Sequence, residues 1–165
     1  MNNISESPYL LPYIGSNIAG ILFLWAAIKK PPLARLMFVL LFGWAAWVNY
    51  TTSHQKPEVY LEYASMSAPW LSGFITGWFS SHITLMVTVI SFGQALIAFG
   101  MLLKGWWVKL SGMGIIIFLA AIAPLGIGSA FPFSITVSIA AWFIFKKDSH
   151  DYLWNFGKQK KVVSV

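Results

Sequence analysis

Cysteine is absent from this chain of 165 residues, and charged residues make up only 10% of it. The first absence excludes disulfides, thiolate catalysis, cysteine-ligated zinc and iron–sulfur clusters. The second separates the chain from soluble domains, in which about a quarter of the residues are charged. With 58% hydrophobic residues, the composition predicts an integral membrane protein with no room for a further soluble domain.

The apolar residues fall into runs that are long enough to cross a hydrocarbon core at about 1.5 Å per residue. The predicted spans are residues 9–28, 33–50, 83–103, 107–126 and 131–146. The fold class is therefore all-α, a single membrane domain with five transmembrane helices.

The two middle spans are separated by a short basic and aromatic turn at residues 104–109. Gly105 supplies backbone freedom, and Trp106 and Trp107 suit the headgroup level. Lys104 and Lys109 can raise their ammonium groups into water along apolar stems. This stretch predicts the tip of a membrane hairpin.

The net charge of +6 is distributed unevenly. With five spans, one side of the membrane receives Lys29, Lys30, Arg35, Lys104, Lys109 and the lysines of the tail, residues 147–165. Only Lys56 falls on the other side. The positive-inside rule then places the N-terminus outside and the tail in the cytoplasm, against anionic lipid of the inner (plasma) membrane. The basic residues are thus explained by topology, and no nucleic-acid partner is expected.

The connection between the second and third spans, residues 51–81, is polar but rich in aromatic residues. Residues 58–67 could form one short helix that Pro69 ends, and residues 68–80 are too short to span. They could lie on the membrane surface or re-enter it. The loop is either a binding surface for a partner or an apolar ligand, or a lid that seals the bundle.

The third span gathers small and hydroxyl side chains on one face, which predicts helix packing. These residues are Thr84, Thr88, Ser91, Ala95 and Ala98, with Gln94 beside them. The Gln94 amide must find a partner inside the bundle. Structural hydrogen bonding is favoured over a ligand contact.

Titratable groups cluster at the outer face rather than within the spans. The candidates are His54, Glu58, Glu62 and His82, together with Tyr60 and Tyr63. They could hold a metal or the head of a quinone, or handle protons during quinol oxidation. The histidines have no metal-ligand spacing, however, and interfacial histidines that are solvated or bonded to the backbone are the favoured interpretation. We therefore predict no catalytic residue and no metal site.

From Arg35 onward the chain resembles the DoxX-like family of small membrane proteins. The resemblance covers about residues 33–146 and rests on Arg35-Leu-Met-Phe-Val-Leu-Leu-Phe-Gly43, the aromatic outer loop, and the Gly100–Gly114 hairpin segment. It implies a four-helix bundle, to which the first span here is an addition. It also implies, for some members, a membrane subunit of a thiosulfate:quinone oxidoreductase. The family's lysine and acidic residue are replaced here by Trp47 or Asn49 and by Gln94.

The leading prediction is a non-catalytic membrane subunit that packs into a larger, respiratory or redox, complex with other membrane subunits. It binds no cofactor alone. The alternatives are a quinone-interacting oxidoreductase subunit acting at the outer leaflet and a small-solute transporter, which needs a water-filled cavity reaching Gln94.

Overall fold

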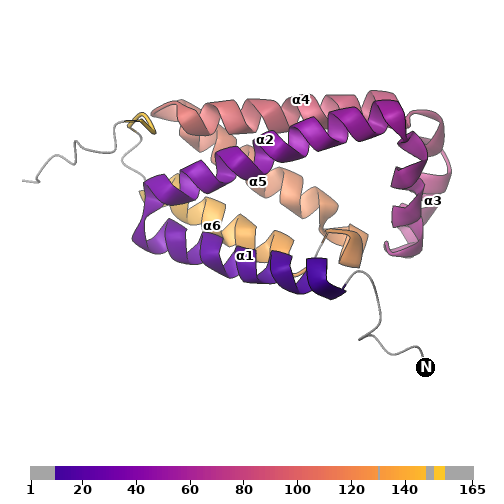
Figure 1. Ribbon diagram of the computed structural model, residues 1–165, viewed down its shortest axis with the longest axis horizontal. Coiled ribbons are helices and arrows are strands. Elements are labelled where there is room, and N and C mark those ends of the chain that lie inside the picture. Colours follow the sequence, from indigo (N-terminus) through magenta and orange to yellow (C-terminus); the bar gives the residue numbers. More distant parts are fainter. Residues whose placement is uncertain (1–9, 130, 148–150, 155–165) are drawn as a thin grey trace, which may run out of the picture.

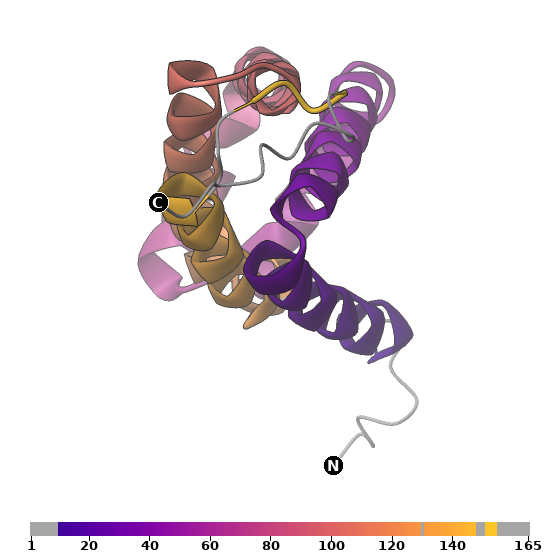
Figure 2. The ribbon, with the colours of Figure 1, turned by 90° about the vertical axis from the view of Figure 1, so that its left-hand side faces the viewer.

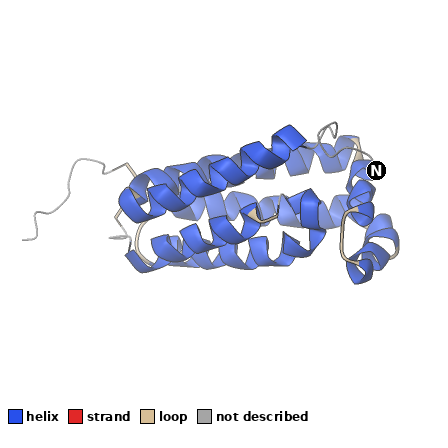
Figure 3. Ribbon diagram, turned by 90° about the horizontal axis from the view of Figure 1, so that it is seen from below, coloured by secondary structure: helices blue, strands red, loops and turns tan. Residues whose placement is uncertain are grey.

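A computed structural model describes residues 10–129, 131–147 and 151–154, and these residues form helices joined by short turns. The helices are α1 (Leu10–Lys29), α2 (Pro31–Gln55), α3 (Pro69–Thr76), α4 (Ile83–Leu102), α5 (Trp106–Ile122) and α6 (Phe133–Lys147). Three short 3-10 helices connect them: η2 (Pro57–Ser65), η3 (Phe79–Ser81) and η4 (Ala123–Ser129). The predicted all-α class is confirmed for the described residues, as Figure 3 shows.

Three helical segments are long and apolar enough to cross a membrane: Pro31–Gln55, Ile83–Leu102 and Trp106–Gly126. Two further apolar helices, Tyr13–Lys29 and Phe133–Lys146, are shorter. Most of the predicted tail, residues 148–150 and 155–165, lies outside the described residues.

The helices pack as a bundle, and α3 lies across one end of it only (Figure 1). α2 runs along α4, while α6 packs against both α1 and α5. Figure 2, seen from the end opposite α3, places α1 and α4 on opposite sides of the bundle. That end carries Lys29, Lys30, Lys104, Lys109 and Lys146, and we call it the basic end.

The core lies where α2, α4, α5 and α6 meet. It includes Phe38 and Phe42 of α2, Met101 of α4, Ile115 of α5 and Ile144 of α6, all buried. The predicted hairpin turn is present, since Gly105 has φ +62°.

The structure differs from the predicted 51–81 loop at its start and at Pro69. α2 continues five residues past Tyr50, to Gln55. There the hydroxyls of Thr51 and Ser53 donate hydrogen bonds to the carbonyls of Val48 and Tyr50, so these polar side chains bond within the helix instead of ending it. Pro69 begins a helix rather than only ending one, because a residue without an N–H is tolerated in the first turn.

Candidate functional site

The remainder of that loop, residues 57–81, folds over one end of the bundle, and we call it the lid (Figure 1). Two contacts hold the lid to η4, the 3-10 helix that follows α5. The Ala68 N–H donates to the Pro124 carbonyl at 3.1 Å. Gly126, with φ +60°, lies so close to the Met66 carbonyl that a Cβ there would be 2.9 Å from its oxygen. Any side chain at position 126 would therefore push the lid away.

A cavity of about 250 Å³ lies beneath the lid, between α2, α4 and α5. The lid contributes Tyr60, Tyr63, Leu71, Phe74, Ile75 and Phe79 to its wall. The helices contribute Asn49 of α2, Val87 and Ile90 of α4, and Phe118 and Ile122 of α5. Apolar and aromatic walls with a few polar groups are typical of sites for small, largely apolar ligands.

The polar groups of the cavity belong to a chain of hydrogen bonds across three elements. The Tyr60 hydroxyl donates to Asn49 Oδ1 at 3.0 Å, and Asn49 Nδ2 donates to Gln94 Oε1 at 2.9 Å. Gln94 is only 2% exposed, so its amide oxygen depends on this bond for solvation. The chain fixes the Tyr60 ring and holds the lid against α2.

The second tyrosine of the cavity, Tyr63, is bonded differently. Its ring centroid lies 6.2 Å from that of Tyr60. Within the part of the chain that the structure describes, its hydroxyl has no hydrogen-bond partner. Tyr63 therefore offers a free hydrogen-bond donor to a molecule in the cavity.

Both phenols stay protonated well above neutral pH. Burial, with a smaller contribution from Tyr63, raises the pKa of Tyr60 to about 12. Burial, and then the negative charge of Glu62, raises the pKa of Tyr63 above its ordinary value of 10.0. Each hydroxyl is thus a donor, not a phenolate, across the physiological range.

The raised pKa of Tyr60 predicts an alkaline transition of the lid. Because the folded pKa lies above the unfolded one, the unfolded state loses its proton first, and stability falls between about pH 10 and 12. In a titration of phenolate absorbance, wild type should show a component near pH 12 that Tyr60→Phe lacks. Superimposable titrations of the two proteins would contradict this assignment.

The two candidate histidines are held to their own segments. The Nδ1 atom of His54 lies 2.8 Å from the Tyr50 carbonyl oxygen, and the His54 and Tyr50 rings are 4.4 Å apart. The Nδ1 atom of His82 lies 2.9 Å from the Trp78 carbonyl oxygen, and its ring stacks on Trp78 at 4.2 Å. Neither histidine lines the cavity beneath the lid.

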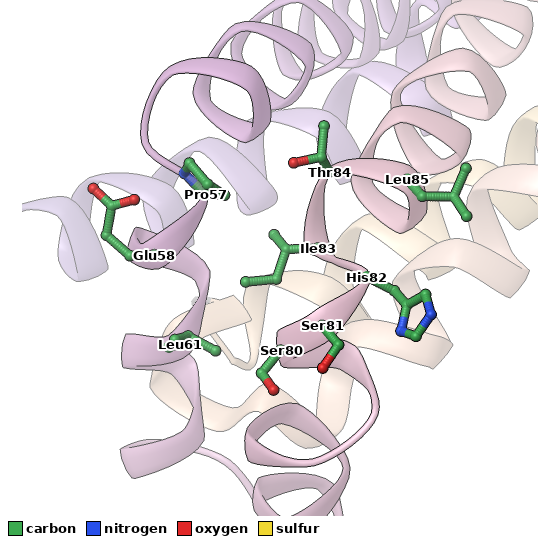
Figure 4. Close-up of a pocket in the computed structure, with 9 residues that line it drawn as sticks. All are labelled: Pro57, Glu58, Leu61, Ser80, Ser81, His82, Ile83, Thr84 and Leu85. Carbon is green, nitrogen blue, oxygen red and sulfur yellow. The ribbon is translucent and has the colours of Figure 1, made fainter.

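Glu58 and His82 line a separate pocket on the outside of the lid. Figure 4 shows the Glu58 carboxylate and the His82 ring on opposite sides of this pocket, turned away from each other. Glu62 is exposed and contributes to the site only through its effect on Tyr63. No group of three or more metal-ligating side chains exists among the described residues. The predicted outer cluster is therefore divided: Tyr60 and Tyr63 line the cavity, whereas His54, Glu58, Glu62 and His82 do not.

Only part of the face of small and hydroxyl residues predicted on α4 is buried in the bundle. Ser91, Gln94 and Ala98 are buried, whereas Thr84 and Ala95 are exposed. Thr84 nevertheless donates to the Ser53 carbonyl of α2 at 2.9 Å. α4 thus faces α2 through a narrower stripe than the spacing of small residues suggests.

Sequence reasoning named Tyr60 but not its hydrogen bond to Asn49, and it missed Arg35 as a buried group. Arg35 is 2% exposed and donates to the carbonyls of Met101, Leu103 and Asp151. It was interpreted as an interfacial charge. The available signal was its position three and seven residues before Phe38 and Phe42, which places it on the buried face of α2.

Comparison with known proteins adds no further constraint. The chain matches no protein-family model, and no curated protein or solved structure is similar to it at a significant level.

Proposed function

We propose that this protein is a non-catalytic membrane subunit that holds the head of an apolar ligand, of the isoprenoid quinone type, beneath its lid. The observation that carries the proposal is the aromatic cavity with one free phenol, Tyr63, beside a phenol fixed by Asn49. Quinone carbonyls accept hydrogen bonds from such donors, and a planar ring fits between aromatic walls.

The size of the cavity sets what part of the ligand it holds. At about 250 Å³ it is slightly below the range of about 300–1,000 Å³ that encloses drug-sized ligands. A single ring fits, and an isoprenoid tail would extend into lipid. In this proposal the chain binds the quinone head, and electron transfer would depend on the cofactor of a partner subunit.

The same proposal includes five membrane crossings, with α1 and α6 as the two short spans. Short apolar helices can cross where the bilayer thins locally. Five crossings put the basic end on one side and Lys56 on the other, which by the positive-inside rule makes the basic end cytoplasmic and the lid external. The asymmetry persists without Arg35, whose charge is buried. The DoxX-like relationship belongs to this proposal as well.

Ligand binding can be tested with the purified full chain and a short-tailed quinone, with saturable quenching of tryptophan fluorescence as the readout. Tyr63→Phe should weaken binding by about threefold to tenfold, the value of one hydrogen bond. Tyr50→Phe is the matched control, because Tyr50 is exposed near the lid but does not line the cavity. Ala121→Trp, which adds bulk at the cavity wall, should abolish binding.

Two results would refute the ligand proposal: no saturable binding by wild type, or equal losses in Tyr63→Phe and Tyr50→Phe. The subunit role has its own test. Purification in mild detergent should recover the chain with other membrane proteins, and a stable isolated monomer would contradict it.

No observation favours transport over this role. A solute pathway would need to reach Gln94, whose oxygen already accepts the Asn49 amide. Gln94 is not among the residues that line the cavity beneath the lid.

A further inference from the structure

A second hollow, which shares no lining residue with the lid's cavity, lies between α5 and α6. It is an apolar groove of about 450 Å³ between the two helices. Its wall includes Ile116 and Ala120 of α5, Ala123 at the start of η4, and Ile135, Ile139 and Trp142 of α6. In a membrane this groove faces lipid.

Each wall of the groove leads to a lysine at the basic end. On α5, Lys109 precedes Ile116 by seven residues, a spacing that keeps both on one helix face. On α6, Lys146 follows Ile139 by seven residues, and Trp142 lies between them on the same face. The groove and its two lysines are therefore one continuous surface.

Aromatic contacts hold both ammonium groups against one pair of rings at the basic end. Lys109 Nζ lies 6.0 Å from the centroid of the Phe145 ring, and Lys146 Nζ lies 4.8 Å from that of Trp142. These two rings stack on each other, with centroids 5.6 Å apart and planes 10° apart. The helices pack closely here, since a Cβ at Gly112 would be in van der Waals contact with the Cβ of Phe145 at 3.7 Å.

The charges of this pair are not neutralised by the described residues. Neither lysine has a carboxylate partner there, and each makes only its cation–π contact. Trp142 remains 43% exposed, as expected for a ring at the headgroup level. Two cations without a carboxylate partner, at the basic-end opening of an apolar groove, are complementary to an anionic head attached to a hydrocarbon chain.

We propose that the α5–α6 groove binds one anionic phospholipid, with its phosphate at Lys109 and Lys146 and an acyl chain along the groove. The dimensions fit a single leaflet. From Trp142 to Ile135 the groove follows seven residues, or about 10 Å of helix, and half of a hydrocarbon core is about 15 Å. The site is independent of the cavity beneath the lid.

The test uses the detergent-solubilised full chain and native mass spectrometry, with phosphatidylglycerol and phosphatidylcholine of identical acyl chains as probes. Phosphatidylglycerol should bind saturably and about tenfold or more tighter than phosphatidylcholine. Lys109→Gln/Lys146→Gln should remove that preference. Ile139→Trp, which fills the groove, should weaken binding of both lipids.

The matched control is Lys29→Gln/Lys30→Gln, which removes the same charge at the same end. Lys30 also sits over a tryptophan, Trp25, at 5.8 Å, but away from the groove. This control should keep the preference for the anionic lipid, and an equal loss in both double variants would overturn the proposal. Glycerol 3-phosphate distinguishes a lipid site from a phosphate site. Competition by this headgroup alone, at lipid concentrations, would also overturn it.

Discussion

Replacing Arg35 by methionine should lower the free energy of unfolding by about 3–5 kcal/mol, the largest effect expected for any single substitution here. Arg35 Nε and Nη2 donate to the Met101 carbonyl at 3.0 and 2.8 Å, and Nη2 also donates to the Leu103 carbonyl. α4 ends at Leu102, so these are carbonyls that its last turn leaves without helical partners. Methionine fills the space but leaves buried acceptors unsatisfied.

The same substitution should loosen the segment after α6. Arg35 Nη1 donates to the Asp151 carbonyl at 2.7 Å, and Leu153 is buried beside it with its N–H bonded to Leu102. Denaturant unfolding in detergent, followed by tryptophan fluorescence, measures the loss of stability. Proteolysis of the segment around Leu153 measures its release.

Two comparisons make this result specific to the guanidinium. Lys30→Met removes an exposed cation at the same end and should change stability by less than about 0.5 kcal/mol. Arg35→Lys keeps the charge but loses the planar fork, so its loss should lie between those of the other two variants. If Arg35→Met lowered the free energy of unfolding no more than Lys30→Met does, the role of the Arg35 guanidinium in holding the end of α4 would be contradicted.

Gly100→Ala should cost about 1–3 kcal/mol, because it overpacks the crossing of α4 and α5. A Cβ at position 100 would collide with the Ser111 hydroxyl and lie 3.3 Å from the Trp107 carbonyl oxygen. The same denaturant measurement applies. Ser111→Gly in the Gly100→Ala background should recover part of the loss, so that the double variant is more stable than the sum of the single effects.

Gly93→Ala is the matched control for this prediction. Gly93 lies in the same helix, and a Cβ there would meet nothing within 4 Å. Alanine should therefore stabilise the helix by about 0.5–1 kcal/mol through its higher propensity. Equal effects at positions 93 and 100 would show that the close crossing does not exist.

The candidate site was predictable only in part. The aromatic loop at residues 51–81 was identified as a lid or a binding surface, and Tyr63 was among the candidates. Tyr60 was named beside Tyr63, and Asn49 was interpreted as a residue that could equally well cap the helix end. Their hydrogen bond was not predictable, because it depends on how far the lid folds back over α2. His54 and His82 had the right chemistry, but each bonds to a carbonyl four residues earlier and does not reach the cavity.

The amino-acid sequence by itself determined that the described chain is helical and that the hairpin turns at Gly105, because apolar run length and glycine's backbone freedom are local properties. Only the tertiary structure decided where Arg35, Asn49 and Gln94 place their polar atoms. Arg35 bonds to Met101, which lies 66 residues away along the chain, and Asn49 bonds to Gln94, which lies 45 residues away. Such long-range hydrogen bonds form only where packing brings the two helices together, and that depends on the whole bundle.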